Sequence, residues 1–198
     1  SMISDNRTSG MDATGGGIHA GDGIVSLVDS EVSGNSTSQM GARGGGIFAS
    51  GGLVSVSNSM IVSNQTLGPA SDGGGVYAAS GVTLQSSVVS GNTTVGDDSD
   101  GGGIYSRDSL AVIQSRIADN ATRGRFAAGG AITADSANVT VRNSSVTRNQ
   151  TSGRYAYGAG LFAARSDVTI EGSTVSENVA TGDSSDGGGV SVFFSSMQ

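Results

Sequence analysis

Four aspartates that fall close together in neighbouring copies of a repeat are the residues best suited to acid–base or metal chemistry. Asp72 and Asp100 occupy the same repeat position, and Asp97 and Asp98 come shortly before Asp100. A pair of carboxyl groups is the catalytic apparatus of glycosidases, and several converging carboxylate oxygens suit Ca²⁺. The three candidate catalytic residues are therefore Asp72, Asp97 and Asp100, and all four aspartates form a candidate Ca²⁺ site.

The alternative interpretation of these aspartates is an acidic loop in solvent. We favour it because the calcium-binding repeat GGxGxD is absent from the sequence. No active-site motif with Asp residues occurs in one repeat alone, as a catalytic site added to a repeat protein would require. We therefore expect no catalytic residue, no cofactor and no resident metal ion.

A column of aromatic side chains at one repeat position is a second candidate site. The column reads His19, Phe48, Tyr77, Tyr105, Thr133, Phe162 and Ser191. Strand alternation predicts that these side chains point outward over glycines, where aromatic rings stack on sugars or on an apolar partner. This predicts an exposed aromatic strip of Phe48, Tyr77, Tyr105 and Phe162. The alternative is that the rings stack on one another under a covering loop, with His19 as a member of the column.

Arginine and aromatic residues also gather in two loops of successive repeats, at Arg125, Phe126, Arg154, Tyr155 and Tyr157. This composition is typical of recognition surfaces. The alternative is a locally stacked loop with cation–π contacts. The same loop column places an aspartate next to each arginine, which predicts salt bridges Asp97–Arg125 and Arg154–Asp183 between neighbouring repeats.

All these residues are positioned by one repeat of 28 or 29 residues. Copies that start with a glycine begin at Gly15, Gly44, Gly73, Gly101, Gly129, Gly158 and Gly187. A constant period of this length is the signature of a stacked solenoid. The chain has 34 glycines and 1 proline, a composition that at fixed spacing indicates ordered repeats rather than a flexible linker.

Each repeat predicts three short strands. The first follows the glycine lead, the second carries two inward aliphatic residues, and the third follows a bend that needs a left-handed backbone. An asparagine ends the repeat, at Asn6, Asn35, Asn64, Asn92, Asn120, Asn149 and Asn178. Six of these begin N-x-T glycosylation sequons. We favour a buried ladder of amides that hydrogen-bond from coil to coil, because a buried amide cannot receive a glycan.

Composition excludes several classes of function. The net charge is −7, and the 10 basic residues are all arginine without a basic cluster, which argues against a nucleic-acid partner. The absence of cysteine excludes disulfides and thiolate metal sites. No apolar run is long enough to span a bilayer, so this segment is not expected to insert into a membrane.

Units such as GGGIFASGGLVSVSNSMIVSN at 44–64 and GGAITADSANVTVRNSSVTRN at 129–149 carry a resemblance that covers nearly the whole chain. The pattern resembles right-handed parallel β-helix proteins of the pectate-lyase-like superfamily. It is most similar to bacterial cell-surface proteins with GGGIY…NSTVSGN repeats, and is similar in part to polymorphic outer-membrane proteins. The expected fold is an all-β, right-handed, single-stranded parallel β-helix. It has six to seven coils and forms one domain over residues 1–198. We also expect a segment of a longer solenoid, with residues 1–2 an expression scar.

The expected function is a non-catalytic, exported or cell-surface β-helix. It would act as an adhesin-like or structural stalk that binds glycans or other surface proteins through the aromatic strip and the arginine loops. The open end coils also favour end-to-end self-association. The alternative, which the resemblance implies, is a polysaccharide lyase or glycoside hydrolase that uses the aspartates beside Tyr77 and Tyr105. A purely structural spacer is the third hypothesis.

Overall fold

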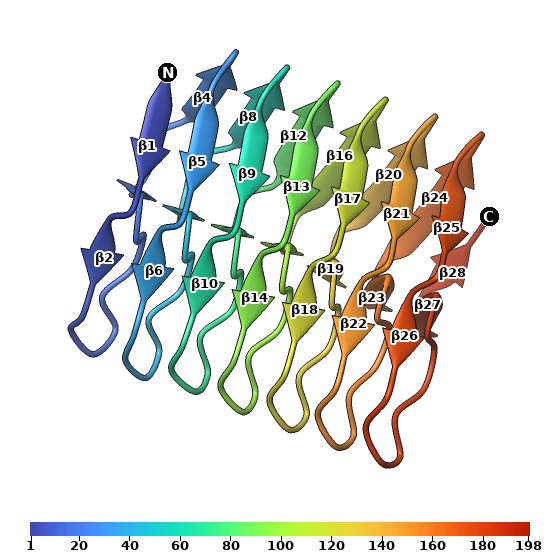
Figure 1. Ribbon diagram of the computed structural model, residues 1–198. Coiled ribbons are helices and arrows are strands. Elements are labelled where there is room, and N and C mark those ends of the chain that lie inside the picture. The colour runs from blue at the N-terminus through green and yellow to red at the C-terminus, as the bar shows by residue number, and fades with distance from the viewer.

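The computed structural model describes residues 1–198 and shows seven coils stacked side by side into a rod (Figure 1). Each coil contributes one strand to each of four parallel, seven-stranded sheets. The N-terminus lies at one end of the rod and the C-terminus at the other. The chain contains no helix, and so none that is long and apolar enough to cross a membrane.

Four sheets are named here by their repeat position. The glycine sheet contains β3 (Ile18–Ala20), β7 (Ile47–Ala49), β11 (Val76–Ala78), β15 (Ile104–Ser106), β19 (Ile132–Asp135), β23 (Leu161–Ala164) and β27 (Val190–Phe193). The valine sheet contains β4 (Val25–Val28), β8 (Val54–Ser57), β12 (Val82–Gln85), β16 (Ser109–Ile113), β20 (Asn138–Arg142), β24 (Asp167–Glu171) and β28 (Ser196–Met197).

The other two sheets follow along each coil. The serine sheet contains β1 (Met2–Ser4), β5 (Glu31–Ser33), β9 (Met60–Val62), β13 (Val88–Ser90), β17 (Arg116–Ala118), β21 (Ser145–Thr147) and β25 (Thr174–Ser176). The sequon sheet contains β2 (Arg7–Thr8), β6 (Ser36–Thr37), β10 (Gln65–Thr66), β14 (Thr93–Thr94), β18 (Ala121–Thr122), β22 (Gln150–Thr151) and β26 (Val179–Ala180). A long loop then returns the chain to the glycine sheet, and these loops form one row along the bottom of Figure 1.

The predicted count of three strands per coil is wrong, because the sequon sheet adds a fourth. Its strands are only two residues long, and each consists of the x and T of the N-x-T motif or its equivalent. Period-two alternation needs a longer stretch to be visible. The strand exists because the residues pair in parallel with both neighbouring coils, as Thr66 does with Thr37 and Thr94.

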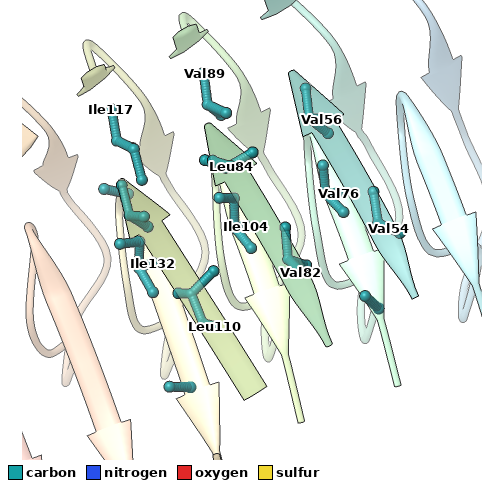
Figure 2. Close-up of a cluster of buried hydrophobic side chains, with 14 of the residues drawn as sticks. Val54, Val56, Val76, Val82, Leu84, Val89, Ile104, Leu110, Ile117 and Ile132 are labelled. Carbon is teal, nitrogen blue, oxygen red and sulfur yellow. The ribbon is translucent and has the colours of Figure 1, made fainter. Parts of the chain in front are cut away.

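Like positions of successive repeats lie next to each other, as the repeat alignment predicts. Val76 of β11 pairs with Ile47 of β7 and with Ile104 of β15. The inward side chains of three sheets meet in one core cluster of 27 buried residues, part of which is shown in Figure 2. Because each aliphatic side chain lies against its own copies, the core is continuous along the rod and burial of apolar surface stabilises every coil.

A left-handed residue turns the chain between the valine and serine sheets in every complete coil. These corner residues have φ between 45° and 54° and are Asp29, Asn58, Ser86, Gln114, Asn143 and Gly172. The predicted bend is therefore confirmed, and Ser86 and Gln114 adopt it although such residues rarely do. The geometry of the stack overrides the local backbone preference at these two positions.

The asparagine ladder is confirmed. Asn64 donates to the side-chain oxygen of Asn92 from its backbone N and from Nδ2, at 2.9 and 3.0 Å. Asn92 in turn donates to Asn120 in the same two ways. The five inner asparagines are at most 1% exposed. Their amides have their hydrogen bonds inside the rod, so these sequons cannot carry a glycan in the folded chain.

Candidate functional site

The aromatic column forms a continuous stack along the glycine sheet. Ring centroids are 5.2 Å apart from His19 to Phe48 and from Phe48 to Tyr77, and 5.1 Å apart from Tyr77 to Tyr105. The planes of Tyr77 and Tyr105 differ by only 7°. In-register parallel pairing places each ring beside its counterpart on the next coil with the planes nearly parallel, and contact between aromatic rings is favourable.

The expected exposure of the aromatic strip is wrong at its centre, where Tyr77 is 3% and Tyr105 is 6% exposed. The guanidinium of Arg43 lies 5.2 Å from the Tyr77 ring centre, and that of Arg107 lies 5.8 Å from the Tyr105 ring centre. Phe48 and Phe162 are half-buried and His19 is exposed. Only the ends of the strip present rings to solvent, and the binding role of this column stays a prediction.

A threonine interrupts the stack after Tyr105. Thr133 is buried and donates to the carbonyl of Ala128 at 2.9 Å, so it holds the long loop rather than a ring. Beyond it, Phe162 packs against Tyr157 and Phe193 at ring distances of 6.3 and 5.8 Å. Tyr157, a predicted binding residue, therefore belongs to this C-terminal aromatic cluster.

Asp72 and Asp100 lie on neighbouring coils beside the aromatic column, as predicted. Asp72 accepts a hydrogen bond from the backbone N of Asp100 at 3.1 Å, and its other oxygen lies 3.2 Å from Nε of Arg43. Asp100 accepts from the backbone N of Ala128 at 2.6 Å. The two carboxyl groups are thus part of a ladder that joins consecutive coils.

Burial changes the acidity of this ladder. It raises the pKa of Asp72, against the lowering effects of its hydrogen bond from Asp100 and of Arg43. It raises the pKa of Asp100 to about 7, with the Asp72 charge acting in the same direction. Burial also raises the pKa of Tyr105 to about 12. Asp100 is therefore a group that exchanges its proton near neutral pH, which is a property of general acids and bases.

The candidate Ca²⁺ site does not form, because Asp72, Asp97, Asp98 and Asp100 do not converge. The favoured acidic loop in solvent describes Asp97 and Asp98 but not the buried Asp72. No group of three or more His, Asp or Glu side chains is placed to hold a metal ion. Asp97 is exposed, and its carboxylate accepts from the backbone N of Arg125 at 2.8 Å. Asp98 is exposed at a left-handed turn with φ 53°. The carboxylate of Asp97 thus holds the long loop of the next coil, while those of Asp72 and Asp100 form the ladder at the end of the loop.

The arginine and aromatic residues of two neighbouring long loops do come together. Phe126 and Tyr155 stack with ring centroids 5.2 Å apart and planes 9° apart. The guanidiniums of Arg125 and Arg154 lie 5.4 and 4.7 Å from these two rings, respectively. We call these four residues the loop patch. Phe126 is 49% exposed, so the patch faces solvent.

The predicted salt bridges Asp97–Arg125 and Arg154–Asp183 are wrong. Arg125 and Arg154 take part in none of the chain's ion pairs. Their guanidiniums lie over the rings instead. The Asp97 carboxylate accepts a hydrogen bond from the backbone N of Arg125. Two cations therefore remain free at the loop patch.

The backbone under the loop patch follows the other long loops, which all have a left-handed residue at the position of Phe126 and Tyr155, but only in these two loops is that residue aromatic. Phe126 and Tyr155 have φ of 57° and 59°, a conformation that is costly for bulky residues. In coils 2 to 4 a threonine hydroxyl anchors the long loop by donating to a carbonyl, as Thr66 does to Ser71 at 2.6 Å. In the two loops of the patch the corresponding Thr122 and Thr151 hydroxyls are buried without a partner.

Both hollows on the molecular surface lie elsewhere, at the corner between the valine and serine sheets. One has a volume of about 430 Å³ and includes Gln114, Arg116 and Asn143 in its lining. The other has about 460 Å³ and includes Asp29 and Asn58. Residue types alone did not predict these hollows, because the concavity depends on the angle between two sheets. The column of left-handed corner residues indicates only where the two sheets meet.

The fold and the coil-to-coil ladders define the chain as a parallel β-helix repeat protein. A family model described as right handed beta helix region matches residues 1–153 and again residues 71–197. The chain therefore belongs to the right-handed β-helix family. No curated protein and no solved structure shows a significant match.

Proposed function

We propose that this chain is a non-catalytic, exported or cell-surface β-helix that acts as an adhesin-like stalk. Its binding surface is the loop patch. The observation that carries the proposal is the exposed Phe126–Tyr155 stack with two unpaired arginines in an acidic chain. Arginine and aromatic residues are enriched among the residues that dominate binding energy.

Every long loop has a left-handed residue at the position of Phe126 and Tyr155, and outside the patch it is Asp12, Gly41, Ala70, Asp98 or Ser184. The two bulky aromatic residues at this position support the same proposal. Glycine would adopt the backbone of Phe126 and Tyr155 without cost, and Gly41 occupies this position in another coil with φ 72°. Two aromatic residues are present instead, over two threonines that lack hydrogen bonds. Departures from locally favourable structure concentrate at functional sites. Free guanidiniums at this surface favour an acidic partner, such as an acidic surface protein or glycan.

The double variant Phe126→Gly/Tyr155→Gly tests this proposal. Glycine removes both rings and fits the left-handed backbone, so the melting temperature should hold or rise while binding is lost. Binding is measured on arrays of neutral and acidic glycans and of immobilised acidic peptides. Ala70→Gly, at the same position of a long loop that contains no aromatic residue, is the matched control and should bind as the wild type does. Equal binding by the double variant and the wild type would contradict the proposal.

A carbohydrate-active enzyme is the second candidate, and the raised pKa of Asp100 favours it. Asp100 lies beside Asp72 with a pKa of about 7 and would serve as general acid. Neither hollow of the surface includes these residues, and Tyr105 beside them is buried. Incubation with polyuronides and neutral polysaccharides, followed by assays of reducing ends and unsaturated products, separates the two functions. If the wild type cleaves one of these polysaccharides and the Asp100→Asn variant does not, the chain is an enzyme and the proposal of a non-catalytic stalk is refuted.

A further inference from the structure

The loop patch places two like charges side by side. Arg125 and Arg154 occupy the same position of consecutive long loops and are both exposed. The two loops pair directly, since the backbone N of Phe126 donates to the carbonyl oxygen of Arg154 at 2.9 Å, and paired positions of neighbouring coils lie about 4.8 Å apart. Like charges that face each other across paired segments are destabilising. An anion that binds both guanidiniums would therefore relieve their repulsion.

No acidic side chain of the chain neutralises this pair of arginines. Neither guanidinium takes part in an ion pair. The Asp97 carboxylate, at the same loop position one coil earlier, accepts from the backbone N of Arg125. Arg123, which is exposed and also outside every ion pair, adds a third cation to the same loop. The patch is therefore a local concentration of positive charge on a chain whose net charge is −7.

The loop that carries Phe126 is held by hydrogen bonds on both sides of the ring. The Asp97 carboxylate accepts from the backbone N of Arg125 at 2.8 Å. The Asp100 carboxyl group accepts from the backbone N of Ala128 at 2.6 Å. The Phe126 ring itself stacks on Tyr155, with the ring centroids 5.2 Å apart. Because these groups are ordered before a ligand arrives, binding costs less conformational entropy.

The arrangement of charges and rings indicates the chemistry of the ligand. A carboxylate has two oxygens and pairs with one guanidinium through two parallel hydrogen bonds. A sulfate or phosphate ester presents three free oxygens and can bind two guanidiniums at once. In each loop the guanidinium also lies near an aromatic ring centre, at 5.4 Å for Arg125 and 4.7 Å for Arg154. A ligand whose oxyanion is attached to an aromatic ring would contact both kinds of group.

We propose that the loop patch binds a tyrosine side chain of a partner protein that carries a sulfate or phosphate ester. The ester oxygens accept hydrogen bonds from the guanidiniums of Arg125 and Arg154. The ring of the modified tyrosine packs against the exposed part of Phe126, which is 49% exposed. The inference rests on the binding function proposed for the loop patch and names the group that the patch recognises. Sulfate and phosphate esters share this chemistry, and the experiment distinguishes them.

Fluorescence anisotropy of the full chain with one labelled, otherwise neutral peptide in four forms tests the proposal. The central residue of the peptide is tyrosine, sulfotyrosine, phosphotyrosine or glutamate. We expect the wild type to bind the sulfotyrosine or the phosphotyrosine form, and the tighter of the two identifies the ester. The tyrosine and glutamate forms should bind at least about tenfold more weakly, because neither places an oxyanion on both guanidiniums.

The double variant Arg125→Gln/Arg154→Gln removes both charges and should lose the binding of the modified peptides. Its melting temperature should hold, since the two side chains make no ion pair. Each single variant should also weaken binding, because both guanidiniums bind the same ester. Arg142→Gln is the matched control, since Arg142 is an exposed arginine that pairs with Glu171 on the valine sheet; this variant should bind as the wild type does.

The inference is overturned if neither modified peptide binds the wild type, if the glutamate form binds as tightly as they do, or if Arg125→Gln/Arg154→Gln binds them as the wild type does. The proposed function has a separate outcome. If acidic glycans or acidic peptides bind the wild type and not Phe126→Gly/Tyr155→Gly, while the modified tyrosines do not bind, the stalk proposal stands and this inference alone is wrong.

Discussion

Equivalent side chains of successive coils hydrogen-bond to one another in ladders along the rod. The asparagine column shows how much one such side chain contributes to the stability of the fold. The side-chain oxygen of Asn92 accepts two hydrogen bonds from Asn64, and its amide donates to Asn120 and to the carbonyls of Ile61 and Ser90. All three asparagines are fully buried. Loss of one member therefore leaves polar groups of its neighbours without partners in a place that water does not reach.

We expect Asn92→Ala to lower the free energy of unfolding by about 3 kcal/mol or more, because each buried unsatisfied group costs roughly 1–3 kcal/mol. Urea unfolding followed by circular dichroism measures the change. Asn6→Ala is the control, since Asn6 is exposed at the end of the ladder; its cost should stay below about 1 kcal/mol. Equal losses for the two variants would show that the ladder is not buried as described.

Asp100 predicts a dependence of stability on pH. An unfolded aspartate has a pKa of about 3.9, whereas burial raises the pKa of Asp100 to about 7. Between these pH values the folded chain keeps a proton that the unfolded chain has lost. The free energy of unfolding should therefore fall as the pH rises from about 4 to about 7, by at most roughly 1.4 kcal/mol per pH unit.

The variant Asp100→Asn should remove this part of the pH dependence, because an amide keeps an acceptor for the N–H of Ala128 but does not ionise. Melting temperatures at pH 4.5 and pH 7.5 measure the effect, with the exposed Asp97→Asn as control. A wild-type difference that persists unchanged in Asp100→Asn would mean that Asp100 is ionised throughout.

At the scale of elements, the glycine strand depends on close approach of neighbouring backbones. A Cβ atom added at Gly74 would lie 2.4 Å from the carbonyl oxygen of Gly102 and 2.6 Å from that of Thr93. This position is therefore crowded by backbone atoms on two sides. It is glycine in every coil but the sixth, where Ala159 is accommodated and remains fully buried.

We expect Gly74→Ala to lower the free energy of unfolding by about 1–3 kcal/mol, the usual cost of overpacking. Gly21→Ala serves as the control, because nothing lies within 4 Å of its added Cβ. That substitution should be neutral, or stabilise by up to about 1 kcal/mol through the unfolded state. Denaturant midpoints of the two variants compare them directly, and a tolerated Gly74→Ala would contradict the observed spacing of the coils.

Elements differ in how well the sequence predicts them. Long period-two stretches, such as the Val82/Leu84 strand, and the asparagine column were predicted correctly because each position repeats its residue type. The two-residue strands of the sequon sheet were missed because alternation needs more than two residues. A cover over the aromatic column was one of two alternatives from the sequence. The sequence did not identify Arg43 as the side chain that lies over Tyr77, since the direction of that side chain is a property of the long loop.

At the scale of the whole molecule, the sequence likewise predicts some features of the candidate sites and not others. Residue spacing predicted that Asp72 lies next to Asp100 and Phe126 next to Tyr155, because a fixed repeat brings equal positions together. Residue spacing could not predict that the side chains of Asp97 and Arg125 form no ion pair. The Asp97 carboxylate instead accepts a hydrogen bond from the backbone N of Arg125. The two hollows at the corner between the valine and serine sheets were not predicted, because a concave surface arises from the angle between two sheets of the assembled rod.

The central claim is that equal positions of successive repeats are immediate neighbours along the rod. Ser26, Ser55 and Thr83 are exposed and occupy one outward column of the valine sheet, with Ser55 paired to both of the others. Neighbouring coils place such positions about 4.8 Å apart, and positions two coils apart roughly 10 Å. The chain has no native cysteine, so introduced thiols react alone.

The most direct measurement compares two double variants, Ser55→Cys/Thr83→Cys and Ser26→Cys/Thr83→Cys, with a short cross-linker that fluoresces only when it bridges two thiols. The stacked coils predict rapid intramolecular bridging in the first variant and none in the second. Bridging in the second variant, or none in the first while the chain remains folded, would contradict the stacking on which every column and site described above depends.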